Sequence, residues 1–551
     1  MNARDDYAST DSRHQKLLLM AILALALVLR LPGFNESLWN DELWSTLLKL
    51  DSVRGLMFEI ATDAHPPFYS VVMFVWVRLF GDSEISVRML PLICGLLTIA
   101  LTARLATEYG SARAAGVAAL ILAISPPHIW YSQEARQYAP LVLMLTACTW
   151  GFRRFRETQA IRWYVAYAAL ALCMVLTHYF AIAYVGAFTL LAMPDRRIRR
   201  RMLWTGVAIA SVIGCYLAVR WRLNVLPTQL GHLRGFGLVQ AWSLFFDWYV
   251  IGGAIGFPGR RGLSTERGVL AVQLVLLALV VRGLYRVAAG SAPTESSLGR
   301  WDAFARRWEL AILLLILPLG LLTLGLIGAK HFYIERSAIT ALPFFAIAVG
   351  IGATSCTSRR WRVASVALIA GFGTLVLANY YARSDRGTVY IANPDWRTAA
   401  QWLRQQHTLS GRPVVILSLT PAVELLYYDH DLRLIDAPRG PTTRVFAADA
   451  QNAGSLRERL KRRFTPPFDT LRGKAGRIYM LGAPEVPLVK SALDREQASE
   501  FFVVTNRHIV NKDRLRDVIA ADPSFVIETV FEPKGVRLLR VRRIAADGEG
   551  G

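Results

Sequence analysis

The sequence predicts a multi-pass α-helical membrane protein with about eleven spans plus interfacial helices, followed by a C-terminal soluble α/β domain. Three observations support this fold class. Apolar residues make up 54% of the 551 residues and collect in blocks close to bilayer length. Basic residues collect at the ends of those blocks, and the formal net charge is +22. From about residue 384 the long blocks give way to short alternating helix-like and strand-like segments.

The composition excludes several other classes of protein. A disordered chain needs low hydrophobicity, and a disulfide scaffold needs far more than five cysteines in a chain this long. A strongly positive charge can indicate a nucleic-acid binder. Here the basic residues flank apolar blocks, where they orient a membrane protein instead, so we expect no nucleic-acid partner.

The apolar blocks define the expected spans, each of which needs about 20 mostly apolar residues. The stretch from 163 to 193 would overshoot the bilayer as a single helix, and we split it at Thr177-His178-Tyr179. The first block has no small-residue cleavage site after it, so we interpret it as an uncleaved span rather than a signal peptide. The candidate spans are 15–33, 88–107, 113–130, 138–152, 163–177, 179–193, 202–220, 268–288, 308–328, 337–355 and 363–381.

Charge decides the orientation. The apolar stretch 68–80 is too short to span and has the length of an interfacial helix. If it lies along the surface, every short basic loop falls on one side of the membrane, as the positive-inside rule requires. The outward segments are then 34–87, 131–137, His178, 221–267, 329–336 and the tail after about 382.

The tail reads as a separate small domain. Its strand-like pieces carry β-branched residues between turn signals. We therefore expect residues 1–383 to form a membrane catalytic domain and residues 384–551 an extracytoplasmic α/β domain. The expected helices are 398–406 and 513–521, and the expected strands are 414–419, 477–481, 526–531 and 536–541. All five cysteines lie in or beside spans and read as small buried apolar residues.

Unusual polar residues collect on the outward side, each group at a membrane boundary. They are Asn40-Asp41-Glu42, His65-Pro66-Pro67, the loop 131–138 (YSQEARQY), His178 and the loop Lys330–Arg336. Ionisable residues at membrane depth are costly, so they tend to be paired or functional. Clustered external arginines in 221–267 suit a phosphate or an anionic headgroup, or a solvated loop.

Each group also has a structural interpretation that the sequence leaves open. Asn40 could cap a helix whose first turn holds Asp41 and Glu42. The two prolines after His65 suit a helix start, Glu134 could pair with Arg136, and His178 could be a satisfied buried histidine. Lys330 and Arg336 could anchor the interface by snorkelling.

The motifs taken together and in order resemble a known family. SLWNDELWS, HPPFY, the run from Arg88 to Pro126, HIWYSQEARQYA and IERSAITALP are similar to the protein O-mannosyltransferase-like branch of the GT-C glycosyltransferases, whose relatives include aminoarabinose and other polyprenyl-phosphate-sugar transferases. The resemblance is strong over 34–140, weaker over 141–355, and in the tail rests on Asn393-Pro394-Asp395-Trp396-Arg397. Many relatives have an aromatic or aliphatic residue where this chain has Asn40.

The resemblance implies transfer of a sugar from a polyprenyl phosphate to an acceptor hydroxyl, with inversion. It implies Asp41 as the catalytic carboxylate and Glu42 as its acidic neighbour. A carboxylate can act as general base, and cations can stabilise the phosphate that leaves. The candidate phosphate-binding cations are Arg136, Lys330 and Arg336, with Arg88 as a further one. The remaining expected substrate-binding residues are His65, Tyr131, Glu134, Tyr138 and His178.

No cofactor follows from the sequence itself. Some relatives place a divalent metal ion near the lipid phosphate with a carboxylate and a histidine, and here His65, His178 and either Glu42 or Asp63 could supply such a pair. The expected partners are a polyprenyl-phosphate-linked sugar donor, a protein, lipid or glycan acceptor, and membrane lipids. The expected location is the bacterial inner membrane, with the active site outside. The sequence does not specify the sugar, the acceptor or the prenyl length.

Two rival functions predict different patterns. A transporter or flippase predicts inverted repeats and charges near the bilayer midplane, whereas here the polar motifs cluster at one face. A non-catalytic scaffold gives no reason for acid, histidine and arginine motifs to gather on the same side.

The predicted topology is testable with a reporter enzyme fused after residue 384. We expect a reporter that works only outside the cytoplasm to be active and one that works only inside to be silent. The reverse pattern would place the tail in the cytoplasm and contradict the assignment of the outward segments.

Overall fold

The computed structural model describes most of the helical part of the chain and the sheet of the tail. The described residues are 3–39, 41–43, 53, 56–57, 60, 65–222, 267–290, 300–326, 335–382, 393–410, 415–418, 428, 433–434, 500–506, 520, 523–533 and 536–543. They form two compact units. The first consists of Met1–Phe34, Thr62–Val72 and Arg88–Ile391, and the second of Asn35–Ala61, Met73–Val87 and Ala392–Gly551.

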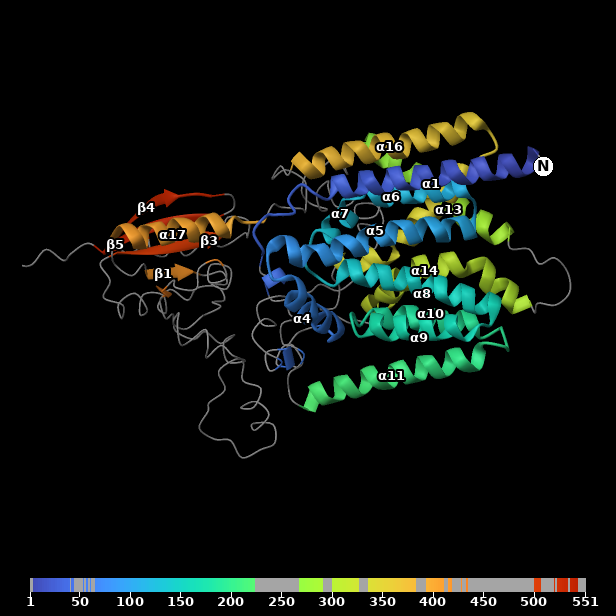
Figure 1. The fold of residues 1–551 in the computed structure, drawn as a ribbon, viewed down its shortest axis with the longest axis horizontal. Coiled ribbons are helices and arrows are strands. Elements are labelled where there is room, and N and C mark those ends of the chain that lie inside the picture. Colours follow the sequence, from blue (N-terminus) through green and yellow to red (C-terminus); the bar gives the residue numbers. More distant parts are fainter. Residues whose placement is uncertain are drawn as a thin grey trace, which may run out of the picture. The chain divides into compact units, whose positions relative to one another are not determined.

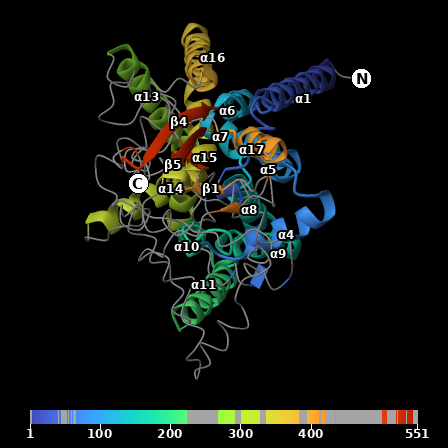
Figure 2. The same ribbon diagram turned by 90° about the vertical axis from the view of Figure 1, so that its left-hand side faces the viewer.

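The first unit is a bundle of helices whose long axes run side by side (Figure 1). Helices α1 and α11 lie at opposite margins of the bundle, as the view turned by 90° also shows (Figure 2). The helices are α1 (Ala3–Leu29), α5 (Glu84–Tyr109), α6 (Ala112–Ile124), α7 (Pro126–Ser132), α8 (Tyr138–Thr158), α9 (Ile161–Val175), α10 (Ala181–Ala192), α11 (Arg199–Arg222), α13 (Arg267–Gly290), α14 (Arg300–Leu326), the 3₁₀ helix η4 (Glu335–Ala341), α15 (Leu342–Thr354) and α16 (Arg359–Ala382).

Each predicted span coincides with one or two of these helices, but eleven spans are not confirmed. Among the described residues, six helices are long and apolar enough to cross a membrane, or seven if the bent pair α6 and α7 forms one span. Helices α9 and α10 are shorter than a bilayer requires, and the chain turns between them at 176–180, where the sequence analysis split the apolar stretch. The short segment 68–80 is helix α4 (Phe68–Phe80), as predicted.

Helix α15 lies at the centre of the bundle because its sequence is apolar on every side. Twelve of its residues are buried, and it packs against α6 and α13. Glycines bring these backbones unusually close: a Cβ on Gly352 would stand 1.9 Å from the Leu279 carbonyl oxygen, and one on Gly350 2.7 Å from that of Ala114. On α13, a Cβ on Gly283 would stand 1.9 Å from the Ala348 carbonyl oxygen. Small residues at membrane-helix interfaces allow this packing.

A buried ion cluster joins three helices of the bundle. Glu309 of α14 is fully buried and accepts a 2.5 Å hydrogen bond from the Tyr109 hydroxyl at the end of α5. It also forms ion pairs with Arg153, at 2.9 Å, and with Arg156, both on α8. A lone buried carboxylate would be costly, and two guanidinium groups offset that cost here. The pairing fixes the end of α8 that the sequence predicts to face the cytoplasm.

The second unit contains a five-stranded mixed sheet with the order β2-β1-β3-β5-β4. The strands are β1 (Val415–Ser418), β2 (Arg433–Leu434), β3 (Glu500–Asn506), β4 (Phe525–Phe531) and β5 (Val536–Arg543). Strand β1 pairs in parallel with β2 and β3, and β5 pairs antiparallel with β3 and β4. The register places Phe502 opposite both Ile416 and Arg540.

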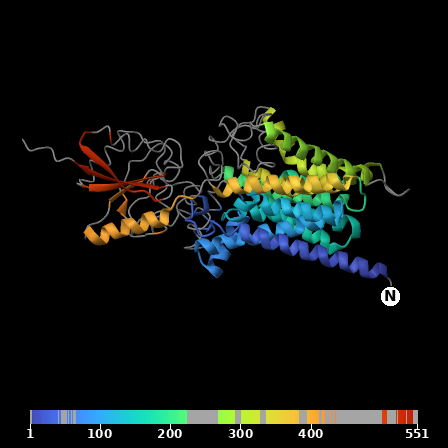
Figure 3. The ribbon, with the colours of Figure 1, turned by 90° about the horizontal axis from the view of Figure 1, so that it is seen from above.

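Helix α17 (Trp396–Ser410) covers one face of this sheet (Figure 3). Its buried side chains Trp396, Ala399, Ala400 and Leu403 pack against a set on β3 and β5: Phe502, Val504, Val536 and Leu538. The predicted helix 398–406 and the predicted strands 414–419, 526–531 and 536–541 coincide with α17, β1, β4 and β5. The predicted strand 477–481 lies outside the described residues, as does nearly all of the predicted helix 513–521.

Strand β3 and the short β2 were not predicted from the sequence. The run from Phe501 to Thr505 has the β-branched and aromatic composition of a buried strand. All five cysteines are free, but the prediction that they are buried holds for only two of them, and Cys173 and Cys356 are half-buried. Cys94 and Cys148 are buried, whereas Cys215 is exposed on α11.

Gly352→Ala is expected to destabilise the bundle by about 1–3 kcal/mol, because the added methyl group would overlap the backbone of α13. Thermal unfolding of the detergent-solubilised protein measures the effect. Gly320→Ala is the matched control, since a Cβ on Gly320 meets nothing within 4 Å. Equal melting temperatures for the two variants would contradict the close packing of α13 and α15.

Candidate functional site

The first unit brings five of the predicted substrate-binding residues into one neighbourhood. The rings of His65 and His178 lie with centroids 5.5 Å apart, and those of Tyr138 and His178 lie 6.4 Å apart. Tyr131 extends the group, with its ring centroid 4.9 Å from that of Tyr138. The charge of Arg136 acts on His178. These five residues, from segments far apart in the sequence, are called the histidine–tyrosine cluster below.

A break in one membrane helix positions this cluster. Helix α6 ends at Ile124, and Pro126 and Pro127 start α7 at an angle of 64°. Proline suits the first turn of a helix but cannot continue one, so the pair of prolines forces the break. Tyr131 lies on α7 and Tyr138 begins α8, so the bend carries the loop 133–137 between them. Every residue from Ser132 to Ala139 is buried.

Arg30, which follows α1, satisfies the carbonyl groups that the break leaves open. Its guanidinium donates hydrogen bonds to the carbonyl oxygens of Ala123 at 3.2 Å and Leu122 at 3.3 Å, at the end of α6, and to that of Ala26 at 2.8 Å. It also donates to Nδ1 of His128 at 2.7 Å. Arg30 is fully buried, and helix ends buried in an apolar bundle need such partners. Neither Arg30 nor His128 was among the site residues predicted from the sequence.

The loop after α7 is tied to the helices around it through Gln133. The Gln133 side-chain nitrogen donates to the carbonyl oxygens of Arg30 and Pro32, both at 2.7 Å. Its side-chain oxygen accepts a 3.1 Å hydrogen bond from the Tyr380 hydroxyl on α16. The loop that carries Glu134 and Arg136 is therefore held in one conformation, with both side chains buried.

His178 sits in the turn between α9 and α10 and is buried. Its Nδ1 accepts a 3.3 Å hydrogen bond from the backbone N–H of Phe180, which leaves the proton on Nε2, 3.4 Å from the Ser337 hydroxyl. Burial, followed by the charges of His65 and Arg136, lowers the pKa of His178 to about 3. The imidazole is therefore neutral at physiological pH and held at both nitrogens, which agrees with the interpretation of His178 as a satisfied buried histidine. Its role in substrate binding stays a prediction.

Further cations surround the turn that carries His178. Arg336 is the second residue of the 3₁₀ helix η4, next to Ser337. Arg220, near the end of α11, is buried and donates to the hydroxyls of Tyr216 at 3.1 Å and Tyr179 at 3.4 Å. Arg220 was not among the predicted site residues. Its position at the outward end of a predicted span indicates a candidate, because ionisable residues at membrane depth tend to be paired or functional.

Of the two other predicted cations, the structure describes only Arg88. Arg88 is buried and donates a 3.0 Å hydrogen bond to the Phe34 carbonyl oxygen, so it holds the chain at the end of the α1 segment. Lys330 lies outside the described residues.

The predicted acids Asp41 and Glu42 belong to the second unit. Residues 41–43 form a helical turn, as the helix-start interpretation expected, and Asn40 lies outside the described residues. Glu42 is fully buried, and its carboxylate accepts a 3.3 Å hydrogen bond from the Trp39 backbone N–H. The Glu42 and Leu43 N–H groups donate back to the Trp39 carbonyl oxygen at 2.9 and 3.0 Å. Glu42 thus closes the turn as in a capping box, while Asp41 is half-buried beside it.

Within the described part of the chain, no group of three or more histidine, cysteine or acidic side chains has the geometry of a metal site. His65 and His178 offer two imidazoles in ring contact. Asp63, one predicted carboxylate partner, lies outside the described residues, and Glu42 belongs to the other unit. A divalent metal ion near the lipid phosphate therefore stays a prediction.

Comparison with known families confirms the resemblance seen in the sequence. Residues 64–219 match the family described as dolichyl-phosphate-mannose-protein mannosyltransferase. This segment contains the whole histidine–tyrosine cluster. A comparison with curated protein sequences gives no match.

Solved structures share the fold. ArnT from Cupriavidus metallidurans in the apo state aligns with a TM-score of 0.55 and 15% identity over 97% of this chain and 99% of that one. The same protein bound to undecaprenyl phosphate aligns over the same shares with a TM-score of 0.51. The archaeal oligosaccharyltransferase AglB from Archaeoglobus fulgidus, in complex with an inhibitory peptide and a dolichol-phosphate, aligns with a TM-score of 0.50 and 13% identity, over 98% of this chain and 75% of AglB. All are GT-C glycosyltransferases, and at these identities they establish a common fold.

The depressed pKa of His178 predicts a defined acid sensitivity. The unfolded chain, with a histidine pKa near 6.5, binds more protons than the folded chain at pH values between about 6.5 and 3. The stability contributed by neutral His178 is therefore present above pH ~6.5 and is lost as the pH falls, by at most about 1.4 kcal/mol per pH unit. Melting temperatures measured from pH 7 to 4.5 should fall less steeply for His178→Gln than for the wild type. His14→Gln, which changes an exposed histidine, should keep the wild-type slope.

Proposed function

We propose, from a segment that matches the mannosyltransferase family and a fold common to GT-C glycosyltransferases, that this chain is a membrane glycosyltransferase using a lipid-phosphate-linked sugar. The observation that carries the proposal is that the matched segment, residues 64–219, contains the assembled histidine–tyrosine cluster. The structure of ArnT with undecaprenyl phosphate supports a polyprenyl phosphate as the class of donor.

The donor phosphate would bind among the cations and hydroxyl groups of the first unit. Arg136 is buried within the loop that Gln133 anchors, and Arg336 lies next to the Ser337 that contacts His178. Lys330 is the third proposed cation. Buried guanidinium groups bind a phosphate strongly because they offer paired donors in a water-poor site. Their charge would stabilise the phosphate monoester as it leaves. His65, Tyr131, Glu134, Tyr138 and His178 would line the binding site for the donor.

The acceptor hydroxyl would be activated by Asp41. Its carboxylate takes the hydroxyl proton while the oxygen attacks the anomeric carbon from the face opposite the phosphate. The bond between the anomeric carbon and the phosphate oxygen breaks, and its electron pair leaves with the polyprenyl phosphate. The configuration inverts, and the leaving group needs no proton because it departs as an anion. Glu42 would support Asp41 by closing the turn on which it lies.

The proposed topology follows the basic loops. Residues 1–383 would form the membrane catalytic domain, and residues 384–551 an extracytoplasmic domain. The reaction would take place on the extracytoplasmic side of a bacterial inner membrane, where the donor is carried in the outer leaflet. The acceptor would be a protein, a lipid or a glycan. A divalent ion, if bound, would lie near the lipid phosphate.

Deletion of the gene is expected to remove one glycan from outer-leaflet lipids or exported proteins, as measured by mass spectrometry of both fractions. Wild-type protein should restore it, and Asp41→Asn should reduce transfer by about 10²–10⁴-fold because the general base is lost.

Asp82→Asn, which changes a carboxylate in the turn between α4 and α5 of the same unit, is the matched control and should restore the glycan. Full restoration by Asp41→Asn at equal protein levels would refute Asp41 as the base. An unchanged glycan profile after deletion would refute the transferase assignment.

A further inference from the structure

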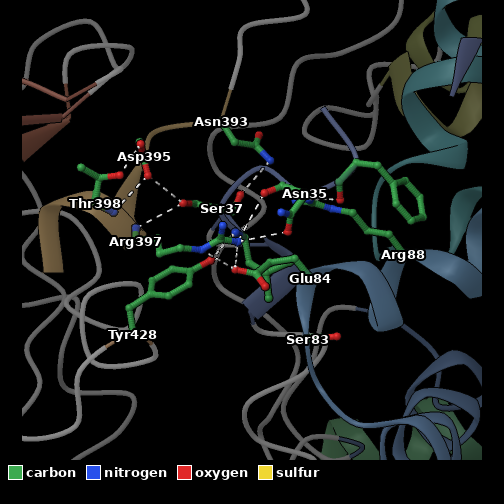
Figure 4. Close-up of polar contacts among 12 residues, drawn as sticks. Asn35, Ser37, Ser83, Glu84, Arg88, Asn393, Asp395, Arg397, Thr398 and Tyr428 are labelled. Atoms are coloured by element: carbon green, nitrogen blue, oxygen red, sulfur yellow. Dashed lines mark hydrogen bonds and ion pairs between the residues drawn. The ribbon is translucent and has the colours of Figure 1, made fainter. Parts of the chain in front are cut away.

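The turn before α17 is organised by Asp395. Its carboxylate accepts hydrogen bonds from the Thr398 backbone N–H at 3.1 Å and from the Thr398 hydroxyl at 2.7 Å, which caps the start of the helix (Figure 4). The same carboxylate accepts a 3.3 Å hydrogen bond from the Ser37 hydroxyl. The carboxylate that caps α17 therefore also fixes Ser37, which lies four residues before Asp41.

Further hydrogen bonds fasten the segment 35–38 to this turn. The Asn393 side chain donates to the Ser37 carbonyl oxygen at 3.1 Å, and the Arg397 backbone N–H donates to the Ser37 hydroxyl at 3.2 Å. The Asn393 backbone N–H donates to the Glu36 carboxylate at 3.3 Å. Main-chain and side-chain groups of 35–38 are therefore fixed by several contacts rather than one.

The Arg397 side chain adds an ion pair to this network. Its Nε donates to the Glu84 carboxylate at 3.1 Å, and its terminal nitrogen bonds the same oxygen and the Asn35 carbonyl oxygen. Tyr428 completes the group: its hydroxyl oxygen accepts a 2.8 Å hydrogen bond from the Leu38 backbone N–H. Burial raises the pKa of Tyr428, and Glu84 raises it further, so the phenol keeps its proton. We call the group formed by Asn393, Asp395, Arg397, Glu84 and Tyr428 the 393–397 clamp.

The fastened segment leads directly into the turn that carries Asp41. Leu38 and Leu43 are fully buried on either side of it, and Glu42 bonds back to Trp39. With the segment before Asp41 clamped and the turn closed behind it, little backbone freedom is left at Asp41 itself. A general base requires such fixation, because a misplacement of about 1 Å can reduce the rate by ~10²-fold.

Tyr428 packs against the hydrophobic core of its unit, whereas the Arg397–Glu84 ion pair of the clamp is not part of that core. That core consists of Trp396, Leu403 and neighbouring residues of α17 packed on β3 and β5, and Arg397 and the segment 35–38 are not part of it. Removal of the Arg397–Glu84 pair should therefore loosen the Asp41 segment without unfolding the sheet. This separation makes a positioning role distinguishable from a merely structural one.

We propose that Arg397, through Glu84, Asn35 and Ser37, is a positioning residue that holds the Asp41 segment in its working conformation. The proposal deepens the proposed function and rests on Asp41 being the base. It assigns to the Asn393–Arg397 motif of the C-terminal segment a direct part in organising the catalytic loop. Arg397 itself touches no reacting atom in this scheme.

Hydrogen exchange on the full chain in detergent tests the clamp without any substrate. In Arg397→Gln and in Glu84→Gln, backbone amides of 35–39 should exchange about 10- to 100-fold faster than in the wild type, because charge-assisted hydrogen bonds are lost. Amides of β3 and β5 should keep their wild-type rates. Arg542→Gln is the matched control: it removes a 3.0 Å pair with Glu500 on the sheet of the same unit and should leave 35–39 unchanged.

The same variants are then scored for glycan restoration in cells that lack the gene. Arg397→Gln should reduce the glycan at least about tenfold at equal protein level. The reversed pair, Arg397→Glu with Glu84→Arg, should recover a substantial part of both the activity and the slow exchange, and Arg542→Gln should be fully active.

The possible results separate the two proposals. Wild-type exchange at 35–39 in Arg397→Gln would overturn the clamp. Faster exchange there with undiminished glycan would overturn the positioning role. Faster exchange throughout β3 and β5 would show a purely structural role and overturn it as well. A glycan profile unchanged by deletion of the gene would instead refute the proposed function, while the exchange result on the clamp would stand.

Discussion

The architecture depends on one constraint: polar and charged groups buried among apolar helices must find partners within the protein. Water is not there to supply them, and each unsatisfied group would cost several kcal/mol. Arg30, Gln133, His178 and Glu309 all meet this constraint with contacts to residues distant in sequence. Because those contacts are directional, they fix the helices more specifically than apolar packing alone can.

The same constraint makes the candidate site possible. A helix broken by two prolines would leave its terminal carbonyl groups exposed to an apolar environment, and the Arg30 guanidinium removes that cost. The broken helix is therefore stable, and it brings Tyr131, Arg136 and Tyr138 close to His178. A buried site of this kind suits phosphate chemistry, since cations act more strongly on a leaving phosphate where water is scarce.

In the second unit the polar network has a different character. Its members are mostly half-buried, and the network combines many hydrogen bonds with the Arg397–Glu84 ion pair. Such a network can hold a loop in place while leaving the hydrophobic core of the unit unaffected. Glu42, the acid predicted beside Asp41, closes the turn on which Asp41 lies by accepting a hydrogen bond from the Trp39 backbone N–H.

The positions of the helices and of the polar motifs along the chain can be predicted from the sequence alone. Apolar blocks of bilayer length and their basic flanks predict the positions of the helices, the short α4 and the turn between α9 and α10, because helix formation and burial in lipid depend on local composition. The ordered motifs from Asp41 to Arg336 predict the family resemblance and contain all five members of the histidine–tyrosine cluster. The predicted eleven spans are not confirmed, because six of the described helices, or seven if the bent pair α6 and α7 forms one span, are long and apolar enough to cross a membrane.

Only the tertiary structure decided which residues meet. No local pattern distinguishes Arg30 from the many basic residues at helix ends, and the outward position of Arg220 does not reveal which groups it contacts. No spacing links Asp395 to Ser37 or Glu309 to Arg153 and Arg156. Their roles arise from contacts between segments that folding brings together, and the free energy of such a contact depends on burial and direction, which a linear sequence does not encode locally. The sequence could place charged groups at the right boundaries, whereas packing selected their partners.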